Sequence, residues 1–269
     1  MIDRGVVAVL AGACFLVACS GEGRERARDE EPGGGRTTAP ADRASGSGGG
    51  PVLRWRMTAG FAGLGPPGSL PEFSLYRDGR AIAKPRRGAE WAAREYRLTS
   101  AALRRLLQEA RAAGLDRPRT IGSDQVADAM ILQITFGSAL TRVVEPESLP
   151  AAPAVRFWKR LDPEAWPPAD QAAPARPYRA PRMAVIAGDS PARPGQRVSD
   201  WPLDRPLGRG ERAAGGLCAI VTGEDRDTVV KHVATASADH RWRSGGRVYS
   251  VRLRPLLPEE RTCQDVAKT

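Results

Sequence analysis

Hydrophobic and polar residues alternate where the folded part of the chain is expected to begin. Leu53, Trp55 and Met57 are separated by Arg54 and Arg56, and a period of two is typical of a β-strand with one buried face. The sequence therefore predicts a strand here that has one apolar face and one basic face.

Turn residues divide three further stretches into paired extended segments, so we predict three hairpins. The first spans residues 73–83 around Asp78-Gly79, a dipeptide that supplies the positive φ angles of a primed turn. The second joins residues 130–136 to residues 139–144, and the third turns at residues 244–246. Two apolar runs predict further strands over residues 183–187 and 217–221.

Apolar residues recur at helical spacing after the first hairpin. The longest stripe consists of Leu103, Leu106, Leu107 and Ala110. It predicts a helix that begins at Thr99 or Ser100 and ends at Gly114. Shorter helices are expected around residues 154–161 and from the capping residue Thr222 to Val233.

Together these elements predict an α+β fold, made mainly of antiparallel strands and hairpins with two or three helices packed on them. Both halves run from a strand through a helix to a hairpin, which suggests two similar βαββ-like halves. The proline-rich residues 163–181 are expected to lack regular structure. We therefore place a connector there, between an N-terminal subdomain (residues 52–162) and a C-terminal subdomain (residues 182–269).

The N-terminal segment has the pattern of a bacterial lipoprotein signal peptide. Residues 6–18 carry no charge, and the run is shorter than the span of about 20 apolar residues that a transmembrane helix needs. The run LVAC that ends at Cys19 matches a lipobox. We therefore predict that residues 1–18 are cleaved off and that the thiol of Cys19 is lipidated.

Two alternatives remain open, namely an ordinary secretory leader cut nearby and lipidation at Cys14. From Cys19 onward, residues 19–51 contain no aliphatic side chain larger than that of alanine. Such a segment buries too little apolar surface to fold, so we expect a disordered tether. The predicted location is the extracytoplasmic face of the cell membrane, held there by the lipid anchor.

The formal net charge of the chain is +10, and several of its arginines crowd the last hairpin. These are Arg241, Arg243, Arg247, Arg252 and Arg254. They predict a site for an anionic surface, such as lipid headgroups or a cell-wall polymer. The alternative is an edge strand whose charges prevent aggregation. Nucleic acid is not an expected partner, because the predicted compartment lacks it.

Two cysteines, Cys218 and Cys263, lie in the expected folded part. A pair of cysteines outside the cytoplasm predicts a disulfide. The alternative is two buried free thiols.

Motifs that could carry chemistry are sparse, so we assign no catalytic residue, metal site or cofactor. His232 and His240 have no third ligand at metal spacing, and we interpret one as a surface residue and the other as a residue at a helix end. We interpret Gly188-Asp189-Ser190 as a turn instead of a nucleophile motif. Glu259-Glu260 is predicted to be a solvated turn instead of a catalytic carboxylate pair.

Four stretches of the sequence carry a resemblance to a family. They are LPEFSLYRDGRAIA, LTSAALRRLLQEARAAGL, ILQITFGSALTRVV and VRLRPLLPEERTC. They resemble an uncharacterised family of lipid-anchored lipoproteins from high-GC Gram-positive bacteria, which contains a domain of unknown function. The resemblance implies no activity, ligand or catalytic residue, and an aspartate of the family corresponds to Asp124 or Asp128.

We therefore expect a membrane-anchored lipoprotein whose folded part is a non-enzymatic binding or structural module of the cell envelope. Its expected partner is a cell-wall polymer, an anionic lipid or another envelope protein. The alternative is a cell-envelope hydrolase with an unrecognised site. The solute-binding subunit of a transporter is disfavoured, because the domain is small and lacks repeated βαβ alternation.

Overall fold

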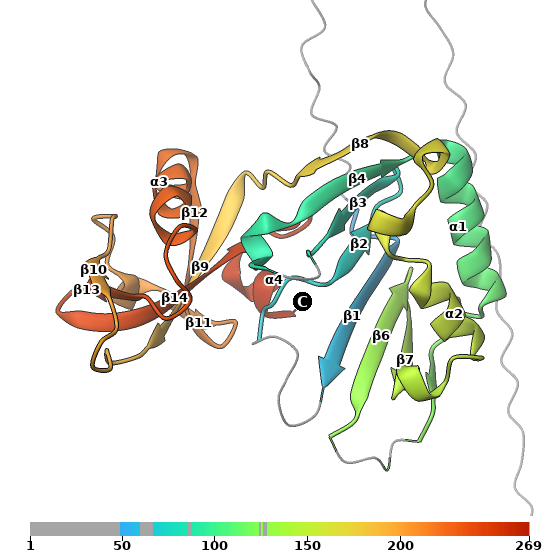
Figure 1. Cartoon of the computed structure of the whole chain (residues 1–269), viewed down its shortest axis with the longest axis horizontal. Helices are drawn as coiled ribbons and strands as arrows, with labels where there is room; N and C mark the ends of the chain where they lie inside the picture. Colours follow the sequence, from blue (N-terminus) through green and yellow to red (C-terminus); the bar gives the residue numbers. More distant parts are fainter. Residues whose placement is uncertain (1–48, 60–66, 86–87, 124, 126–127, 269) are drawn as a thin grey trace, which may run out of the picture. The chain divides into compact units, whose positions relative to one another are not determined.

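The computed structural model describes residues 49–59, 67–85, 88–123, 125 and 128–268. In this part of the chain, fourteen strands form two mixed, mostly antiparallel sheets, and four α-helices accompany them (Figure 1). The predicted α+β class is therefore confirmed.

The first sheet has eight strands in the order β5-β7-β6-β1-β2-β3-β4-β8. Its strands are β1 (Leu53–Ala59), β2 (Phe73–Leu75), β3 (Arg80–Ala83), β4 (Arg94–Leu98), β5 (Arg119–Ile121), β6 (Met130–Phe136), β7 (Ala139–Val144) and β8 (Gln171–Pro177). The β5–β7 pair is parallel, and the other neighbours are antiparallel. Helices α1 (Ser100–Ala112) and α2 (Pro153–Lys159) pack on the apolar face of this sheet.

The second sheet has six strands in the order β10-β13-β14-β9-β12-β11. Its strands are β9 (Arg182–Asp189), β10 (Val198–Asp200), β11 (Glu211–Ala213), β12 (Gly216–Thr222), β13 (Arg241–Ser244) and β14 (Arg247–Pro255). The β10–β13 pair is parallel, and the other neighbours are antiparallel. Helices α3 (Gly223–Val233) and α4 (Cys263–Lys268) accompany this sheet.

Short 3-10 helices lie in the connections of the described chain. They are η1 (Glu90–Ala92), η2 (Pro146–Ser148), η3 (Pro163–Ala165), η4 (Pro168–Asp170) and η5 (Leu207–Arg209).

The alternating segment forms β1 as predicted, and its apolar residues enter the first core. Leu53 is fully buried, and Trp55 lies edge-on to Trp158 of α2, with the ring centroids 5.7 Å apart. Helix α1 begins after Thr99, whose hydroxyl accepts a hydrogen bond from the backbone N–H of Ala102 at 3.2 Å. This side-chain cap satisfies one of the N–H groups that the first turn of a helix leaves without a partner.

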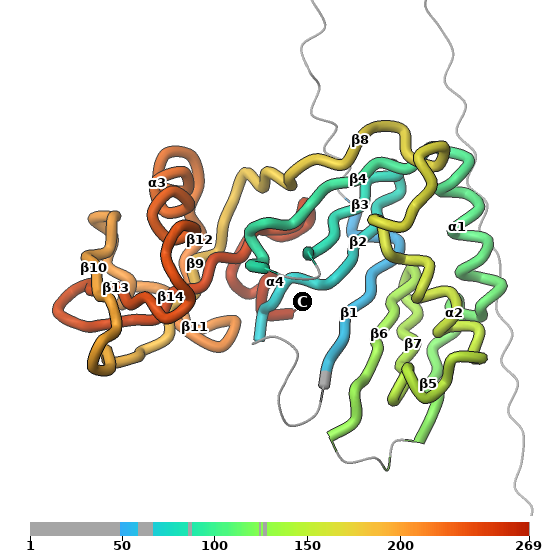
Figure 2. The backbone as a smooth tube through the Cα atoms, viewed as in Figure 1, coloured from blue at the N-terminus to red at the C-terminus, as the bar shows by residue number. Residues whose placement is uncertain are grey.

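The proline-rich stretch is more regular than the sequence predicts. Residues 171–177 form β8, which pairs antiparallel with β4 at the edge of the first sheet (Figure 2). An edge strand tolerates Pro174 and Pro177, because half of its N–H positions need no partner in the sheet. The expectation of an irregular connector over residues 163–181 is therefore wrong for β8, and the chain passes to the second sheet between Pro177 and Arg182.

The two halves are not copies of one βαββ arrangement. In the first sheet, the leading strand of the hairpin after the helix, β6, lies next to β1. In the second sheet, the trailing strand of the corresponding hairpin, β14, lies next to β9. The order of the hairpin strands is thus reversed, so the similarity of the two sequence patterns does not extend to topology.

Strand β9 is covered on both faces, which explains its continuous apolar sequence. Met183 and Val185 pack in a cluster with Val229 of α3. Ala184 and Ile186, which alternate with them, pack in a different cluster with Val266 of α4. Because neighbouring residues of a strand point to opposite faces, α3 and α4 lie on opposite sides of the second sheet.

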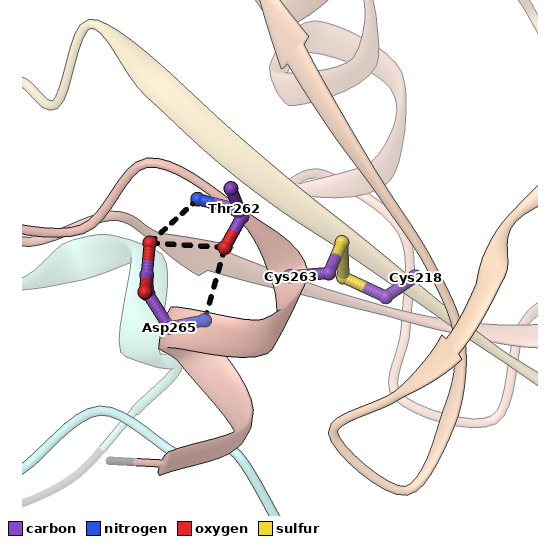
Figure 3. Close-up of a disulfide and its surroundings, with 4 residues drawn as sticks. All are labelled: Cys218, Thr262, Cys263 and Asp265. Atoms are coloured by element: carbon purple, nitrogen blue, oxygen red, sulfur yellow. Dashed lines mark hydrogen bonds between the residues drawn. A yellow bond between two sulfur atoms is a disulfide. The ribbon is translucent and has the colours of Figure 1, made fainter.

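The short helix α4 is fixed at its start by a disulfide and a reciprocal cap (Figure 3). The disulfide joins Cys263 to Cys218 of β12, with their Cα atoms 6.0 Å apart. The Asp265 carboxylate accepts hydrogen bonds from the backbone N–H groups of Arg261 and Thr262, which lower its pKa. In return, the Thr262 hydroxyl accepts a hydrogen bond from the Asp265 backbone N–H at 3.2 Å.

The prediction of a solvated turn at Glu259-Glu260 is wrong. Glu260 is only 2% exposed and forms a two-pronged ion pair with Arg254 of β14, which is fully buried. The backbone N–H of Leu257 donates a further hydrogen bond to the same carboxylate at 2.6 Å. A buried guanidinium needs a charged partner, and the chain supplies one by folding back six residues later.

Glu259 binds residues of the first sheet and its hairpin. Its carboxylate pairs with Arg54 of β1 and accepts a hydrogen bond from the Tyr76 hydroxyl at 2.8 Å. Burial and the nearby carboxylate raise the pKa of Tyr76, so the hydroxyl stays protonated and remains a donor. The segment that carries Glu259, Glu260 and Cys263 thus contacts both sheets.

We predict that the Cys218–Cys263 disulfide stabilises the folded chain. The cysteines are 45 residues apart, and closing a loop of that length restricts the unfolded chain by about 4 kcal/mol in the entropy model, an upper figure. Replacing both cysteines with alanine should lower the free energy of unfolding by about 2–4 kcal/mol in denaturant titrations. Reductant should destabilise the natural chain similarly and leave the double variant unchanged; alkylation of both thiols in native, unreduced protein would contradict the pairing.

We also predict that Glu260→Gln lowers the free energy of unfolding by about 3 kcal/mol or more, because it leaves the buried Arg254 charge without a counter-charge. The matched control is Glu147→Gln, since Glu147 pairs with Lys159 at 3.4 Å and its side chain is 72% exposed. The control should cost about 0.5 kcal/mol or less. Equal losses in the two variants would show that burial of the ion pair is not what matters.

Candidate functional site

The predicted anchor lies outside the described residues. This applies to Cys19, to the alternative acceptor Cys14 and to the tether up to residue 48. Of the two loop aspartates, Asp124 is likewise outside, whereas Asp128 is exposed and has a φ of 58°. Among the described residues, no helix is long and apolar enough to cross a membrane.

The arginines of the last hairpin are engaged within the protein. Four of them bind carboxylates, in the pairs Arg243–Asp200, Arg247–Asp189, Arg252–Glu90 and Arg254–Glu260. Arg241 donates to the Ser190 hydroxyl and to the backbone carbonyls of Asp239 and His240. Since Arg254 is fully buried, it cannot contact an anionic surface, which corrects the expectation for this member of the predicted site.

The structure brings His232 and His240 to a single cleft, although they come from different elements. We call it the histidine cleft, and its volume is about 520 Å³. It is lined by Arg197, Ser199, Asp200, His232, Thr235, Ala236, Ser237, His240 and Trp242. One wall is the end of α3 and the residues after it, and the other is the edge formed by β10 and β13.

The parallel pairing of β10 with β13 explains how this wall is built. Ser199 stands opposite Trp242 in the register, and the backbone N–H of Arg241 donates to the Arg197 carbonyl at 2.9 Å. Because side chains alternate along a strand, Arg197 and Ser199 share a face with His240 and Trp242. Arg241 belongs to the opposite face.

His240 is held in place by an aromatic contact. Its ring lies 4.8 Å from that of Trp242, centroid to centroid, and Trp242 in turn packs edge-on against Trp201 at 5.9 Å. The Nε2 atom of His240 is buried and has no hydrogen-bond partner among the described residues. A buried polar atom without a partner is uncommon in native folds, and a ligand or a water molecule can satisfy it.

The sequence interpretation of the two histidines is only partly correct. His232 is exposed in the last turn of α3, so it is both the surface histidine and the one at a helix end. His240 precedes β13 and is half-buried. Sequence reasoning also missed Arg197, because the short strand β10 has no periodicity that would have revealed it.

The remaining candidate groups are tied into the scaffold. In Gly188-Asp189-Ser190, Asp189 is paired with Arg247, and the Ser190 hydroxyl accepts from Arg241 at 3.2 Å. These contacts give both side chains a structural role. No group of three or more histidine, cysteine or acidic residues that could hold a metal ion occurs in the described ranges.

A second hollow, of about 270 Å³, lies between α1 and residues 159–170. Its charged side chains are largely paired with each other, Arg105 with Asp170 at 2.6 Å and Arg160 with Glu109 at 3.2 Å. By contrast, Arg197 and His232 of the histidine cleft have no side-chain ion pair or hydrogen bond within the described chain. The histidine cleft therefore offers more free binding groups.

Comparison of the chain with protein-family models, with curated proteins and with solved structures found no match. The resemblance to envelope lipoproteins therefore stays a prediction from the sequence.

Proposed function

We propose that this protein is a lipoprotein of the extracytoplasmic face of the cell membrane, anchored through Cys19, and that its folded part is a non-enzymatic binding module. The observation that carries the proposal is the buried Cys218–Cys263 pair at disulfide distance. Disulfides persist in oxidising compartments, which agrees with the location that the lipobox predicts.

The histidine cleft supports binding as the task of the folded part. It combines free imidazole and guanidinium groups with hydroxyls and an indole, and its volume falls within the range of about 300–1,000 Å³ that is usual for small-molecule sites. The Asp189 and Ser190 side chains, which a hydrolase could have used, are occupied by arginines of β13 and β14. These contacts favour the binding module over the hydrolase.

The anchor is tested with Cys19→Ala in the native host, with Cys14→Ala as the matched control. Cells are labelled with palmitate, and the membrane and soluble fractions are compared. We expect Cys19→Ala to lose the label and to accumulate as released protein or uncleaved precursor, because the thiol is the acceptor of the lipid. Cys14→Ala should keep both label and membrane retention.

The opposite pattern, with label lost in the Cys14 variant only, would move the anchor to Cys14. Normal retention of both variants without any label would contradict the lipoprotein assignment.

A further inference from the structure

We propose that the histidine cleft binds an anionic group of phosphate type, carried on a small soluble ligand. This inference rests on the proposed binding function and specifies the chemical class of the ligand.

Three nitrogen-bearing side chains from three segments converge on the cleft. Arg197 comes from the residues before β10, His232 from α3 and His240 from the residues before β13. The guanidinium of Arg197 has no partner in the described chain, and its planar fork of donors matches the oxygens of a phosphate group. Imidazoles can donate hydrogen bonds to the same oxygens.

The one carboxylate in the lining has an arginine partner. Asp200 binds Arg243 at 3.3 Å, and the register places these two residues side by side on β10 and β13. Both belong to the strand face opposite Ser199 and Trp242. An anion in the cleft would therefore meet the nitrogen donors without facing an unpaired carboxylate of the lining.

The end of α3 is the wall that would repel an anion, and its last carbonyls are partly hydrogen-bonded. The C-terminus of a helix carries partial negative charge on its free carbonyls, but here those carbonyls have donors. The Val230 carbonyl accepts from Ala234 N–H at 3.0 Å, and the Val233 carbonyl accepts from Ala236 N–H at 3.2 Å. The Thr235 hydroxyl lies 3.0 Å from the Lys231 carbonyl, within hydrogen-bond distance. These contacts reduce the repulsion that an anion would meet at this wall.

The volume of the cleft limits the size of the ligand. A volume of about 520 Å³ exceeds what an inorganic phosphate ion fills, so the cleft has room for further ligand atoms. Ser199, Thr235 and Ser237 supply hydroxyls along the rim for those atoms. A small phosphomonoester meets both requirements.

The test uses the fact that the chain contains only two histidines. The full chain, labelled with ¹³C-histidine and held in neutral detergent, gives two imidazole Cε1–H signals in NMR spectra. Glycerol 3-phosphate, inorganic phosphate, glycerol and phosphatidylglycerol vesicles are each titrated at constant ionic strength, with sodium chloride as the control. We expect both signals to shift saturably with either phosphate compound and to remain in place with chloride.

Variants identify the groups responsible. Arg197→Gln should weaken the apparent affinity for glycerol 3-phosphate roughly tenfold, because a charged hydrogen-bond donor is lost. The matched control is Arg193→Gln, an exposed arginine of the same segment that does not line the cleft, and it should bind normally. His232→Gln removes one signal, assigns the other to His240 and should also weaken binding.

Four outcomes would overturn the inference. Shifts that follow ionic strength alone, or equal effects of Arg197→Gln and Arg193→Gln, would exclude a phosphate site at the cleft. A saturable response to glycerol but none to phosphate would leave a binding module with a neutral ligand. Signals that respond only to phosphatidylglycerol vesicles would replace the soluble ligand with a lipid headgroup. Each of these results is independent of the palmitate experiment, which tests the anchor.

Discussion

The buried ion pair between Arg254 and Glu260 is the constraint on which the arrangement of the described chain depends. The buried guanidinium of Arg254 is tolerated only with a carboxylate beside it. The chain after β14 must therefore turn back over the sheet to bring Glu260 there. That turn delivers Glu259 to Arg54 and Tyr76 of the first half and brings Cys263 to Cys218. One electrostatic requirement thus fixes the contacts of the C-terminal segment with both sheets.

Local sequence patterns predicted those elements whose stabilising contacts lie within a few residues of each other. The alternation in β1, the Asp78-Gly79 turn and the capped stripe of α1 are all encoded within a few residues, and each occurs in the structure. The edge strands β5, β8 and β10 escaped prediction, and each is hydrogen-bonded to a strand that is not its neighbour in sequence. The prolines correctly argued against a central strand over residues 171–177, but proline is compatible with an edge strand.

The candidate site shows the same difference between local patterns, which the sequence reveals, and contacts between distant residues, which it does not. Both histidines were visible as residue types, but the approach of Arg197 to them depends on the parallel pairing of β10 with β13, two strands separated by forty residues of chain. The arginines of the last hairpin looked like a basic surface because the carboxylate partners of Arg243, Arg247 and Arg252 are remote in sequence. Arg252 and Glu90, for example, are 162 residues apart. Charge counted along a sequence therefore overstates the charge that a folded surface presents.

The return of the C-terminal segment has a consequence for the order of folding. Arg54 and Glu259 are separated by 205 residues, and every strand of both sheets is synthesised before that glutamate. The guanidinium of Arg54 in the opening strand therefore has no carboxylate partner until residue 259 has been synthesised. During this interval the nascent polypeptide exposes surfaces that later become interior. A chaperone that covers these surfaces would protect the chain from aggregation until the C-terminal segment is made.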